Sequence, residues 1–487
     1  MASLQTVLAT GDGPLIREEG VEDHRFYWVG RSSERIAMLH RKPRVLILGG
    51  GFGGMYAALE FERALARGAD VDVTLVNRDN FFLFTPMLHE VAASDLDSTN
   101  IVSPIRKLLR RVTFFHGDIE AIDLANQRVS LSHGHEEHCH SLPYDHLVLA
   151  LGSTTNFFNL PGVADHALTM KSLDDAIVLR NRLIANLEEA DFECSPFSRT
   201  PLLNFVVAGG GFAGVETIAA MNDFLREAVR FFPHLREDML RIILVHPEAV
   251  ILPELGEKLG TYAQQKLMEQ KVEIHSNCKV TAVTDREVML SDGTRVTTNT
   301  LVWTAGTSPN ALLATLPCPK ARGRLLVNEY LEVPEWPGVW ALGDCAVVPD
   351  RKTGKPHPPT AQHALREGKV AAQNVLATLR GDRKKPFVFS TLGRLAPIGK
   401  RTGVANILGV NFSGFIAWWL WRTIYLMKLP RFEKKVLVAL DWTLDLIFSK
   451  DLVQIRTARP GTLPLADEEP EEQASPALDG ADIEHVN

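Results

Sequence analysis

The stretch RVLILGGGFGGMYAALEFERAL, residues 44–65, decides the fold of this chain. Its apolar run Val45–Leu48 predicts a short buried strand, and the Ala-rich segment after the glycines predicts a helix. Between them, Gly49, Gly51 and Gly54 have the GxGxxG spacing. In that pattern the first glycine makes the turn, the second lets the backbone approach a pyrophosphate at the helix N-terminus, and the third lets the helix pack on the strand. The stretch therefore predicts a dinucleotide site in a Rossmann-like α/β domain.

A second copy of the pattern begins 160 residues later, in NFVVAGGGFAGVETIAAMNDFL, residues 204–225. Here Val206–Ala208 predicts the strand, and Gly209, Gly211 and Gly214 make the turn. A single GxGxxG match is weak support for a binding site, because unrelated glycine turns also match it. Two copies, each between a predicted strand and a predicted helix, indicate that the chain binds two dinucleotides.

The strand that follows each glycine turn is expected to end on a residue that binds the ribose. The first such strand ends on Asn77, followed by Arg78, where an acidic residue is usual. Asparagine can still hydrogen-bond a hydroxyl group. The second strand ends on His246, with Glu248 two residues later. A carboxylate repels the 2′-phosphate of NADPH, so Glu248 favours NADH, while His246 weakens that preference.

Further segments indicate which two dinucleotides bind. Each is a strand followed by a turn of small residues: LVLALGS (residues 147–153), LVWTAGTSPN (301–310) and GVWALGDCA (338–346). Asp344, at the end of the last strand, is well placed to accept a hydrogen bond from a flavin ribityl hydroxyl. A helix that begins at Ala361, with Thr360 as its N-cap, can aim its amides at the flavin ring. The predicted cofactors are therefore FAD and NADH.

Composition and charge argue against several classes of function. Apolar content of 45% and charged content of 23% are typical of globular proteins, and a net charge of −7 argues against a nucleic-acid partner. The five cysteines form no CxxC pair, which argues against a disulfide framework, a zinc site and a cysteine-dependent flavoenzyme such as a sulfide:quinone reductase. HGHEEHCH, residues 133–140, is predicted to be a solvated loop, and no metal site is predicted.

The segment FSGFIAWWLWRTIYLMKLPRFEKK, residues 412–435, is unusually apolar. Trp418, Trp419 and Trp421 point in different directions on a helix, so they cannot share one core pocket. Tryptophan favours membrane interfaces, and the adjacent lysines and arginines suit anionic headgroups. Residues 436–448 predict a second apolar helix, but no segment has the ~20 apolar residues of a membrane-spanning helix. The segment therefore predicts a peripheral membrane contact, with a buried helix pair or dimer contact as the alternative.

In this order the motifs resemble those of the two-dinucleotide-domain flavoproteins. NFFLFTPMLHEVAA (residues 80–93) and GGGFAGVE (209–216) narrow the resemblance to type II NADH dehydrogenases, over about residues 43–457. The resemblance implies cofactor contacts at Gly49, Gly51, Phe52, Gly53, Gly54, Asn77, Arg78, Gly152, Gly209, Gly211, Gly214, Glu248, Gly306, Asp344, Ala361 and Gln362. It also implies catalytic roles for Glu216, near the nicotinamide, and Gln362, on the quinone side. The family usually has a second glutamine one turn after the first, and this chain has Arg366 at that position.

The predicted fold is α/β, with two Rossmann-like domains and a C-terminal amphipathic helical segment. Its predicted parts are an N-terminal extension (1–43), an FAD domain in two pieces (44–160 and 305–395), an inserted NADH domain (161–304), a membrane-associated segment (396–457) and an acidic disordered tail (458–487). The predicted function is hydride transfer from NADH to FAD, then two-electron reduction of a membrane quinone without proton pumping. We expect a peripheral protein on the cytoplasmic face of the cell membrane, as a possible homodimer. The alternatives are a soluble NAD(P)H-dependent reductase of another acceptor and a non-enzymatic FAD/NADH redox sensor.

Overall fold

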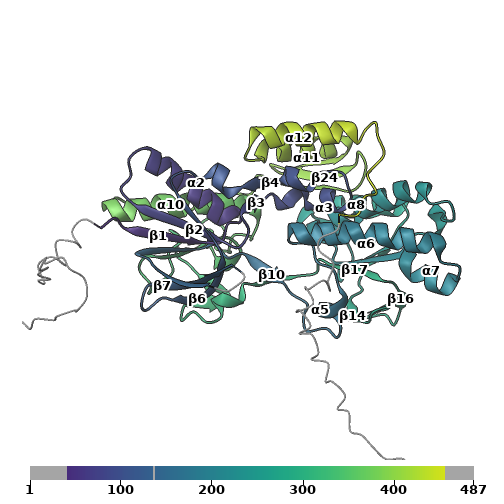
Figure 1. The fold of residues 1–487 in the computed structure, drawn as a ribbon, viewed down its shortest axis with the longest axis horizontal. Helices are drawn as coiled ribbons and strands as arrows, with labels where there is room; N and C mark the ends of the chain where they lie inside the picture. The colour runs from purple at the N-terminus through teal and green to yellow at the C-terminus, as the bar shows by residue number, and fades with distance from the viewer. Residues whose placement is uncertain (1–40, 135–137, 456–487) are drawn as a thin grey trace, which may run out of the picture. The chain divides into compact units, whose positions relative to one another are not determined.

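The computed structural model describes residues 41–134 and 138–455. The predicted acidic tail and nearly all of the predicted N-terminal extension lie outside these residues. The described helices and strands belong to the compact unit that begins at Pro43. That unit contains two parallel sheets covered by helices, so the predicted α/β fold class is confirmed (Figure 1).

The first sheet contains the first glycine turn. Its order is β21 (Val339–Ala341), β9 (His146–Leu149), β1 (Arg44–Leu48), β2 (Asp72–Asn77) and β5 (Thr113–His116), all parallel. Helices α2 (Phe52–Ala66) and α10 (Ala361–Arg380) pack together on one face (Figure 1). They approach so closely that a Cβ at Gly368 would lie 2.1 Å from the Gly53 carbonyl oxygen. The meander β6 (Asp118–Asp123), β7 (Arg128–His133) and β8 (His138–Pro143) lies on the other face.

The second sheet repeats this arrangement. Its order is β13 (Val272–His275), β12 (Arg241–Val245), β11 (Asn204–Ala208) and β17 (Thr300–Trp303), again parallel. Helix α8 (Phe212–Ala228) follows the second glycine turn, and α6 (Leu173–Phe192) begins with a capping box between Ser172 and Asp175. The remaining elements of this half are α5 (Val163–His166), α7 (Pro196–Leu203), α9 (Glu257–Glu269), β14 (Val280–Val283), β15 (Glu287–Leu290) and β16 (Arg295–Thr297).

Two antiparallel strands connect the halves. β10 (Ser153–Thr155) leaves the first sheet and pairs with β18 (Thr307–Pro309), which returns from the second. The chain then re-enters the first sheet at β21. Shorter elements complete the first half: β3 (Phe81–Leu83), α3 (Leu88–Ala92), β4 (Val102–Pro104), α4 (Ile105–Leu108), β19 (Lys320–Ala321), β20 (Arg324–Leu326) and β22 (Ala346–Val347).

The C-terminal segment forms a small meander with two helices. The strands are β23 (Gly393–Pro397), β24 (Gly403–Ile407) and β25 (Val410–Gly414), and the helices are α11 (Phe415–Lys428) and α12 (Phe432–Leu444). Trp421 is only 1% exposed, and its ring lies 6.3 Å from Trp442 and 4.9 Å from Tyr425. Trp419 is 53% exposed. The clustered tryptophans therefore divide between the core and the surface.

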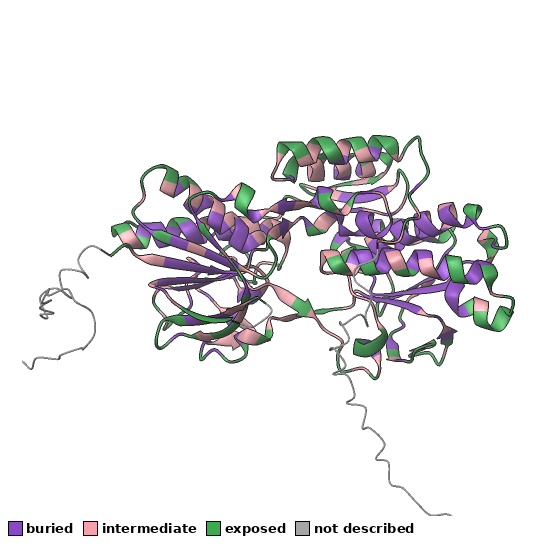
Figure 2. Ribbon diagram, viewed as in Figure 1, coloured by how far each residue is buried: buried purple, intermediate pink, exposed green. Residues whose placement is uncertain are grey.

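The outer side of α11 and α12 is apolar and exposed (Figure 2). This α11–α12 apolar surface consists of Phe415, Ile416, Trp419, Met427, Phe432, Val436, Leu437, Leu440 and Leu444. Among the described residues, no helix is both long enough and apolar enough to cross a bilayer.

Candidate functional site

The first glycine turn has the geometry that a pyrophosphate site requires. Gly49 has φ +100°, and a Cβ at Gly54 would lie 1.9 Å from the Gly49 carbonyl oxygen. No atom lies within 4 Å of the position where Gly51 would carry a Cβ. Gly51 is the N-cap of α2 and offers no capping side chain, so the first amides of this helix remain available to an anion. These observations fit a dinucleotide at this turn.

The second turn matches the first closely. Gly209 has φ +116°, a Cβ at Gly214 would lie 1.8 Å from the Gly209 carbonyl oxygen, and the space above Gly211 is open. Gly211 caps α8 without a side-chain hydrogen bond. The same test therefore favours a second dinucleotide at α8.

Asn77 and His246 occupy equivalent places beside the two turns. Asn77 Oδ1 accepts a hydrogen bond from Gly50 N at 2.8 Å, and His246 Nδ1 accepts one from Gly210 N at 3.0 Å. Because Nδ1 is an acceptor, the neutral His246 carries its proton on Nε2, which is buried without a partner among the described residues. Glu248 lies exposed two residues further on.

Asp344 lies at the end of β21, where the sequence predicts a flavin contact. Its Oδ2 accepts a hydrogen bond from Ser153 Oγ at 2.6 Å, and Lys171 Nζ donates to the same Oγ at 2.8 Å. Beneath it, Glu367 is 2% exposed and accepts a hydrogen bond from Gly343 N at 2.7 Å. Burial raises the pKa of Glu367 to about 7. Lys171, in the bend before α6, and Glu367, in α10, were not predicted as site residues, because nothing local in the sequence marks either one.

Helix α10 begins at Ala361 as predicted, with Thr360 as its N-cap residue, but the expected side-chain cap is absent. The Thr360 hydroxyl instead lies 2.7 Å from His363 Nδ1. Gln362 Nε2 donates to the Gly393 carbonyl oxygen at 3.2 Å, which ties the helix to β23. Arg366 stacks on the Phe389 ring at 4.0 Å from the centroid and donates to the Gln362 carbonyl oxygen at 2.7 Å. Arg366 is thereby held against the helix.

Glu216, in the first turns of α8, lies among residues of α3 and α11. Its side chain is 14% exposed, and its Oε2 lies 3.9 Å from His89 Nδ1. Burial, and then the charge of Glu90, raise the pKa of Glu216 well above its usual value. Burial, and then Lys450, lower the pKa of His89 to about 3. His89 is therefore uncharged at pH 7, so its approach to Glu216 is not a salt bridge.

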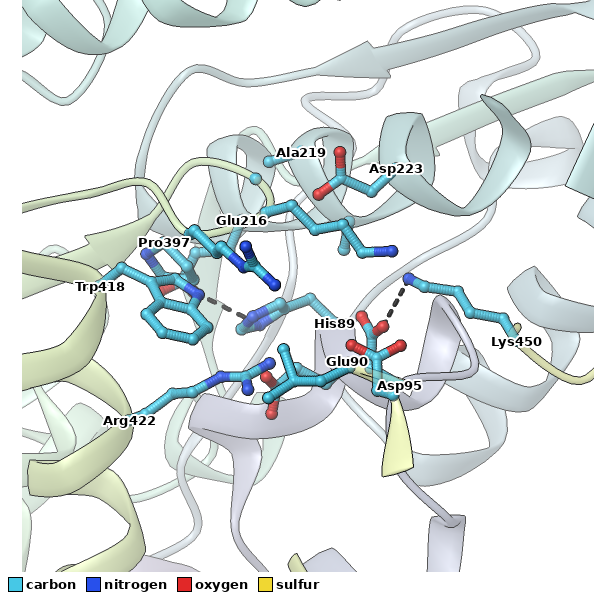
Figure 3. A pocket seen from close by; sticks show the side chains of 16 residues that line it. His89, Glu90, Asp95, Glu216, Ala219, Asp223, Pro397, Trp418, Arg422 and Lys450 are labelled. Atoms are coloured by element: carbon cyan, nitrogen blue, oxygen red, sulfur yellow. Dashed lines mark ion pairs between the residues drawn. The ribbon is translucent and has the colours of Figure 1, made fainter. Parts of the chain in front are cut away.

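A cavity of about 290 Å³ adjoins Glu216 (Figure 3). It lies between α3, α8, the β23–β24 loop and the C-terminal segment, and most of its lining side chains are ionisable. They are His89, Glu90, Asp95, Glu216, Asp223, Lys400, Arg401, Arg422, Asp445 and Lys450. Lys450 Nζ lies 2.5 Å from Asp95 Oδ1, and this pair is nearly fully buried. We call this space the charged chamber.

Two carboxyl groups in the charged chamber have pKa values close to neutrality. Burial raises the pKa of Glu90 to about 8, although Trp442 Nε1 donates to Glu90 Oε1 at 3.1 Å. Burial also raises the pKa of Asp223 to about 6. Arg422 lies between the rings of Trp418 and Trp442, with its guanidinium carbon 4.3 and 4.7 Å from their centroids. The chamber can therefore hold and exchange protons near pH 7.

The remaining predicted site residues lie around these features. Phe52 begins α2 and makes an edge contact with Phe82 at 5.1 Å, while Arg78 is exposed beside Asp79 at 4.0 Å. Gly152 and Gly306 have φ +68° and +112°, at the ends of the connecting strands. Gly53 packs against Leu342, which leaves no space for a side chain. Their ligand contacts remain predictions.

Several residues of the charged chamber were not singled out from the sequence. His89 and Glu90 lie in the stretch at residues 80–93, which carries the family resemblance but indicates no role for either side chain. Asp95 and Lys450 are 355 positions apart, and no local pattern connects them. Lys450 follows the apolar residues 436–448, but its burial cannot be read from the sequence.

The histidine-rich stretch forms a hairpin tip between β7 and β8. His133 Nε2 lies 2.7 Å from His140 Nε2, and the rings stack at 4.7 Å. Residues 135–137 of this stretch lie outside the described residues. Elsewhere in residues 41–455, no group of three metal-binding side chains is arranged to hold an ion.

Comparison with known proteins identifies relatives of the whole described chain. The family of pyridine nucleotide-disulphide oxidoreductases matches residues 43–368, and the NDH2 C-terminal domain matches residues 392–451. The type II NADH:quinone oxidoreductase Ndh of Mycobacterium tuberculosis is 34% identical over 435 residues, covering 86% of this chain and 91% of that protein. Demethylphylloquinone reductase NdbB of Synechocystis is 32% identical over 413 residues, covering 83% and 96%. The structure of NDH2 from Plasmodium falciparum in complex with NADH has a TM-score of 0.79 and 20% identity over 85% of this chain and 100% of that one, which shows a shared fold.

Proposed function

Because this chain belongs to the type II NADH:quinone oxidoreductases, we propose how its own residues carry out the reaction of that family. The chain transfers electrons from NADH through FAD to a quinone, without proton pumping. The predicted enzyme class, both predicted cofactors and the quinone acceptor are thereby confirmed. The roles of individual residues, the membrane contact and the cellular location are proposals.

The overall reaction needs a proton that NADH does not supply. Reducing a quinone to its quinol adds two electrons and two protons, whereas a hydride carries two electrons and one proton. The balanced reaction is NADH + H⁺ + quinone → NAD⁺ + quinol, so each turnover takes one proton from the medium. A group that holds a proton inside the protein at pH 7 is needed to deliver it.

We assign this proton to Glu216. The observation that carries the proposal is the position of Glu216 in the lining of the charged chamber, with its Oε2 3.9 Å from His89 Nδ1, where burial and then Glu90 raise the pKa of its carboxyl group well above the usual value. Glu216 borders the charged chamber, where Glu90 and Asp223 have pKa values of about 8 and about 6. After Glu216 gives up its proton, these carboxyl groups return one from the solvent side. A negative charge on Glu216 is disfavoured by burial, so the carboxyl group regains a proton readily.

The two glycine turns hold the cofactors. Gly49, Gly51 and Gly54 would leave the amides of α2 free to bind the FAD pyrophosphate, and Asp344 would accept a hydrogen bond from the ribityl chain. When bound, FAD would supply the two-electron carrier between NADH and the quinone. The amides at the start of α8 would bind the NADH pyrophosphate, and His246, bonded to Gly210 N, would keep that turn in place. Gln362, tied to Gly393, keeps the N-terminus of α10 in place on the quinone side.

The α11–α12 apolar surface is the proposed membrane contact. Its nine side chains are exposed although each is large and apolar, which is costly in water unless a partner covers them. A bilayer also holds the lipid-soluble quinone. We place the protein on the cytoplasmic face of the cell membrane, where NADH is available. We further propose a homodimer, which sedimentation in detergent above its critical micelle concentration would test.

The test of the proton assignment is Glu216→Gln, which keeps the shape of the side chain and removes its exchangeable proton. Stopped-flow reduction of the bound flavin by NADH should stay within about twofold of the wild type. Steady-state turnover with a water-soluble quinone should fall by roughly 10²-fold, the usual effect of removing a general acid. Glu189→Gln, on the exposed face of α6, is the matched control. Unchanged quinone turnover in Glu216→Gln would contradict the assignment.

A further inference from the structure

A basic cluster follows β4 at the edge of the first sheet. The sequence IRKLLRR, residues 105–111, forms α4 and the turn into β5, and its four cations are Arg106, Lys107, Arg110 and Arg111. All four side chains are exposed. In the described part of the chain, only Arg111 has a carboxylate partner, because its Nη1 lies 3.3 Å from Glu62 Oε1. Three positive charges therefore remain unpaired.

The turn that carries these cations is held rigidly. Glu62 Oε2 accepts backbone hydrogen bonds from Arg110, Arg111 and Val112 at 3.1, 2.8 and 3.0 Å. Burial alone would raise the pKa of Glu62, but these amide bonds lower it below its usual value, so the carboxylate stays charged. Arg106 is held on the other side, with its guanidinium carbon 5.0 Å from the centroid of the Phe114 ring. The arginines are therefore pre-organised by the surrounding structure.

These arginines line an open hollow of about 430 Å³. Its polar lining residues are Arg106, Arg110, Arg111 and Thr113. A guanidinium group binds phosphate oxygens through two parallel hydrogen bonds, and several such groups around one hollow suit a phosphate ester. The chemistry of this hollow therefore suits an anion such as a phosphate group rather than an apolar ligand.

The cluster is connected to the proposed membrane contact. Lys434 Nζ of α12 donates to the Thr99 carbonyl oxygen at 2.7 Å, and Asn100 Nδ2 donates to Asp441 Oδ2 of α12 at 2.7 Å. From this contact the chain runs directly through β4 into α4. Figure 1 shows β4 next to α11 and α12. The arginines therefore follow, 6 to 11 positions later in the chain, the residue that contacts α12.

We propose that Arg106, Arg110 and Arg111 bind the phosphates of anionic phospholipid headgroups, and that this site orients the first sheet against the membrane. The inference rests on the proposed membrane contact of the α11–α12 apolar surface. Apolar insertion at one end and phosphate binding at the other would fix the tilt of the enzyme. The quinone side of the site would then face the acyl chains.

Vesicle flotation of the FAD-loaded, full-length enzyme tests the proposal. One set of vesicles is phosphatidylcholine alone, and the other also contains phosphatidylglycerol. The variant is Arg106→Gln with Arg110→Gln. Its matched control is Arg286→Gln with Arg295→Gln, which removes the same charge on the β15–β16 hairpin, away from α11 and α12 in Figure 1. FAD content and turnover with a water-soluble quinone confirm that each variant is folded.

We expect the wild type and the control to bind the anionic vesicles more tightly than the neutral ones. Each cation near an anionic surface contributes about fivefold to partitioning, so the double variant should lose roughly 25-fold on anionic vesicles and little on neutral ones. Arg106→Lys with Arg110→Lys keeps both charges but loses the paired hydrogen bonds of each guanidinium group, so it should bind the anionic vesicles less tightly than the wild type and more tightly than the glutamine variant. Unchanged binding of the glutamine variant to anionic vesicles would overturn the proposal.

Two further results would overturn it for different reasons. If inorganic phosphate binds to the hollow but leaves the preference for anionic vesicles unchanged at constant ionic strength, the hollow is a site for free phosphate. If the wild type floats with neither vesicle yet still reduces a soluble quinone, the membrane contact itself is wrong. In that case the proposed function fails in its membrane part, which is distinguishable from failure of the arginine site alone.

Discussion

Replacing Trp421 or Trp419 by a small residue should produce opposite defects, although the two tryptophans are two positions apart. Trp421 is 1% exposed and packs against His89, Tyr425 and Trp442, with ring centroids 5.5, 4.9 and 6.3 Å away. Trp419 is 53% exposed on the α11–α12 apolar surface. The first therefore contributes to folding, and the second contributes to the membrane contact.

The magnitudes follow from burial. Trp421→Ala removes a fully buried aromatic side chain, and such changes cost about 3–5 kcal/mol of unfolding free energy. A tryptophan presents roughly 200 Å² of surface, so the exposed half of Trp419 is about 100 Å². At about 25 cal/mol/Å², inserting that area into a bilayer contributes about 2.5 kcal/mol, or roughly 70-fold in partitioning. Trp419→Ser should leave stability within about 0.5 kcal/mol.

Two assays separate the effects: thermal unfolding followed by circular dichroism with release of FAD fluorescence, and flotation with neutral vesicles. Trp421→Ala should unfold at a lower temperature than the wild type, and Trp419→Ser should unfold with the wild type but float poorly. If Trp419→Ser instead loses FAD or stability, the outer side of α11 is covered by protein. If it floats as well as the wild type, the proposed membrane surface is wrong.

Three other changes test the interior and the cofactor site. Glu367→Gln should alter the pH dependence of stability while keeping the hydrogen bond to Gly343. The pKa of Glu367 in the folded protein, about 7, lies above the usual value of 4.5, so the stability of the wild type is full below pH 4.5 and falls by about 3 kcal/mol as the pH rises through 7. Chemical denaturation at pH 5 and pH 8 should show that the variant lacks this loss. Glu248→Gln should raise kcat/KM for NADPH by about fivefold with little change for NADH, since it removes one charge near the 2′-phosphate, and an unchanged cofactor ratio would show that Glu248 does not face the ribose. Lys450→Met should destabilise the protein by about 3–5 kcal/mol, measured by urea denaturation, because it leaves Asp95 buried without its partner 2.5 Å away. If the variant is as stable as the wild type, Asp95 is protonated.

The amino-acid sequence by itself determined the two dinucleotide turns and the class of fold. Their signals are local: an apolar strand, glycines at fixed spacing and a helix start. Backbone sterics impose these requirements at each position, and Gly49 and Gly209 do adopt positive φ. The start of α10 at Ala361 was predicted from another local signal, because Thr360 is a residue type that favours the N-cap position. The ligand contacts inferred by resemblance, including Asp344 and Glu248, remain predictions.

Only the tertiary structure decided which side chains share an environment. Trp419 and Trp421 are alike in sequence, but packing against α12 buries one and exposes the other. Asn77 and His246 stand where a ribose-binding residue was expected, yet the side chain of each accepts a hydrogen bond from a backbone amide of its glycine turn. The charged chamber brings Asp95 and Lys450 within 2.5 Å across 355 positions. Burial and charge pairing depend on such long-range packing, and they set the pKa values that the proposed proton delivery requires.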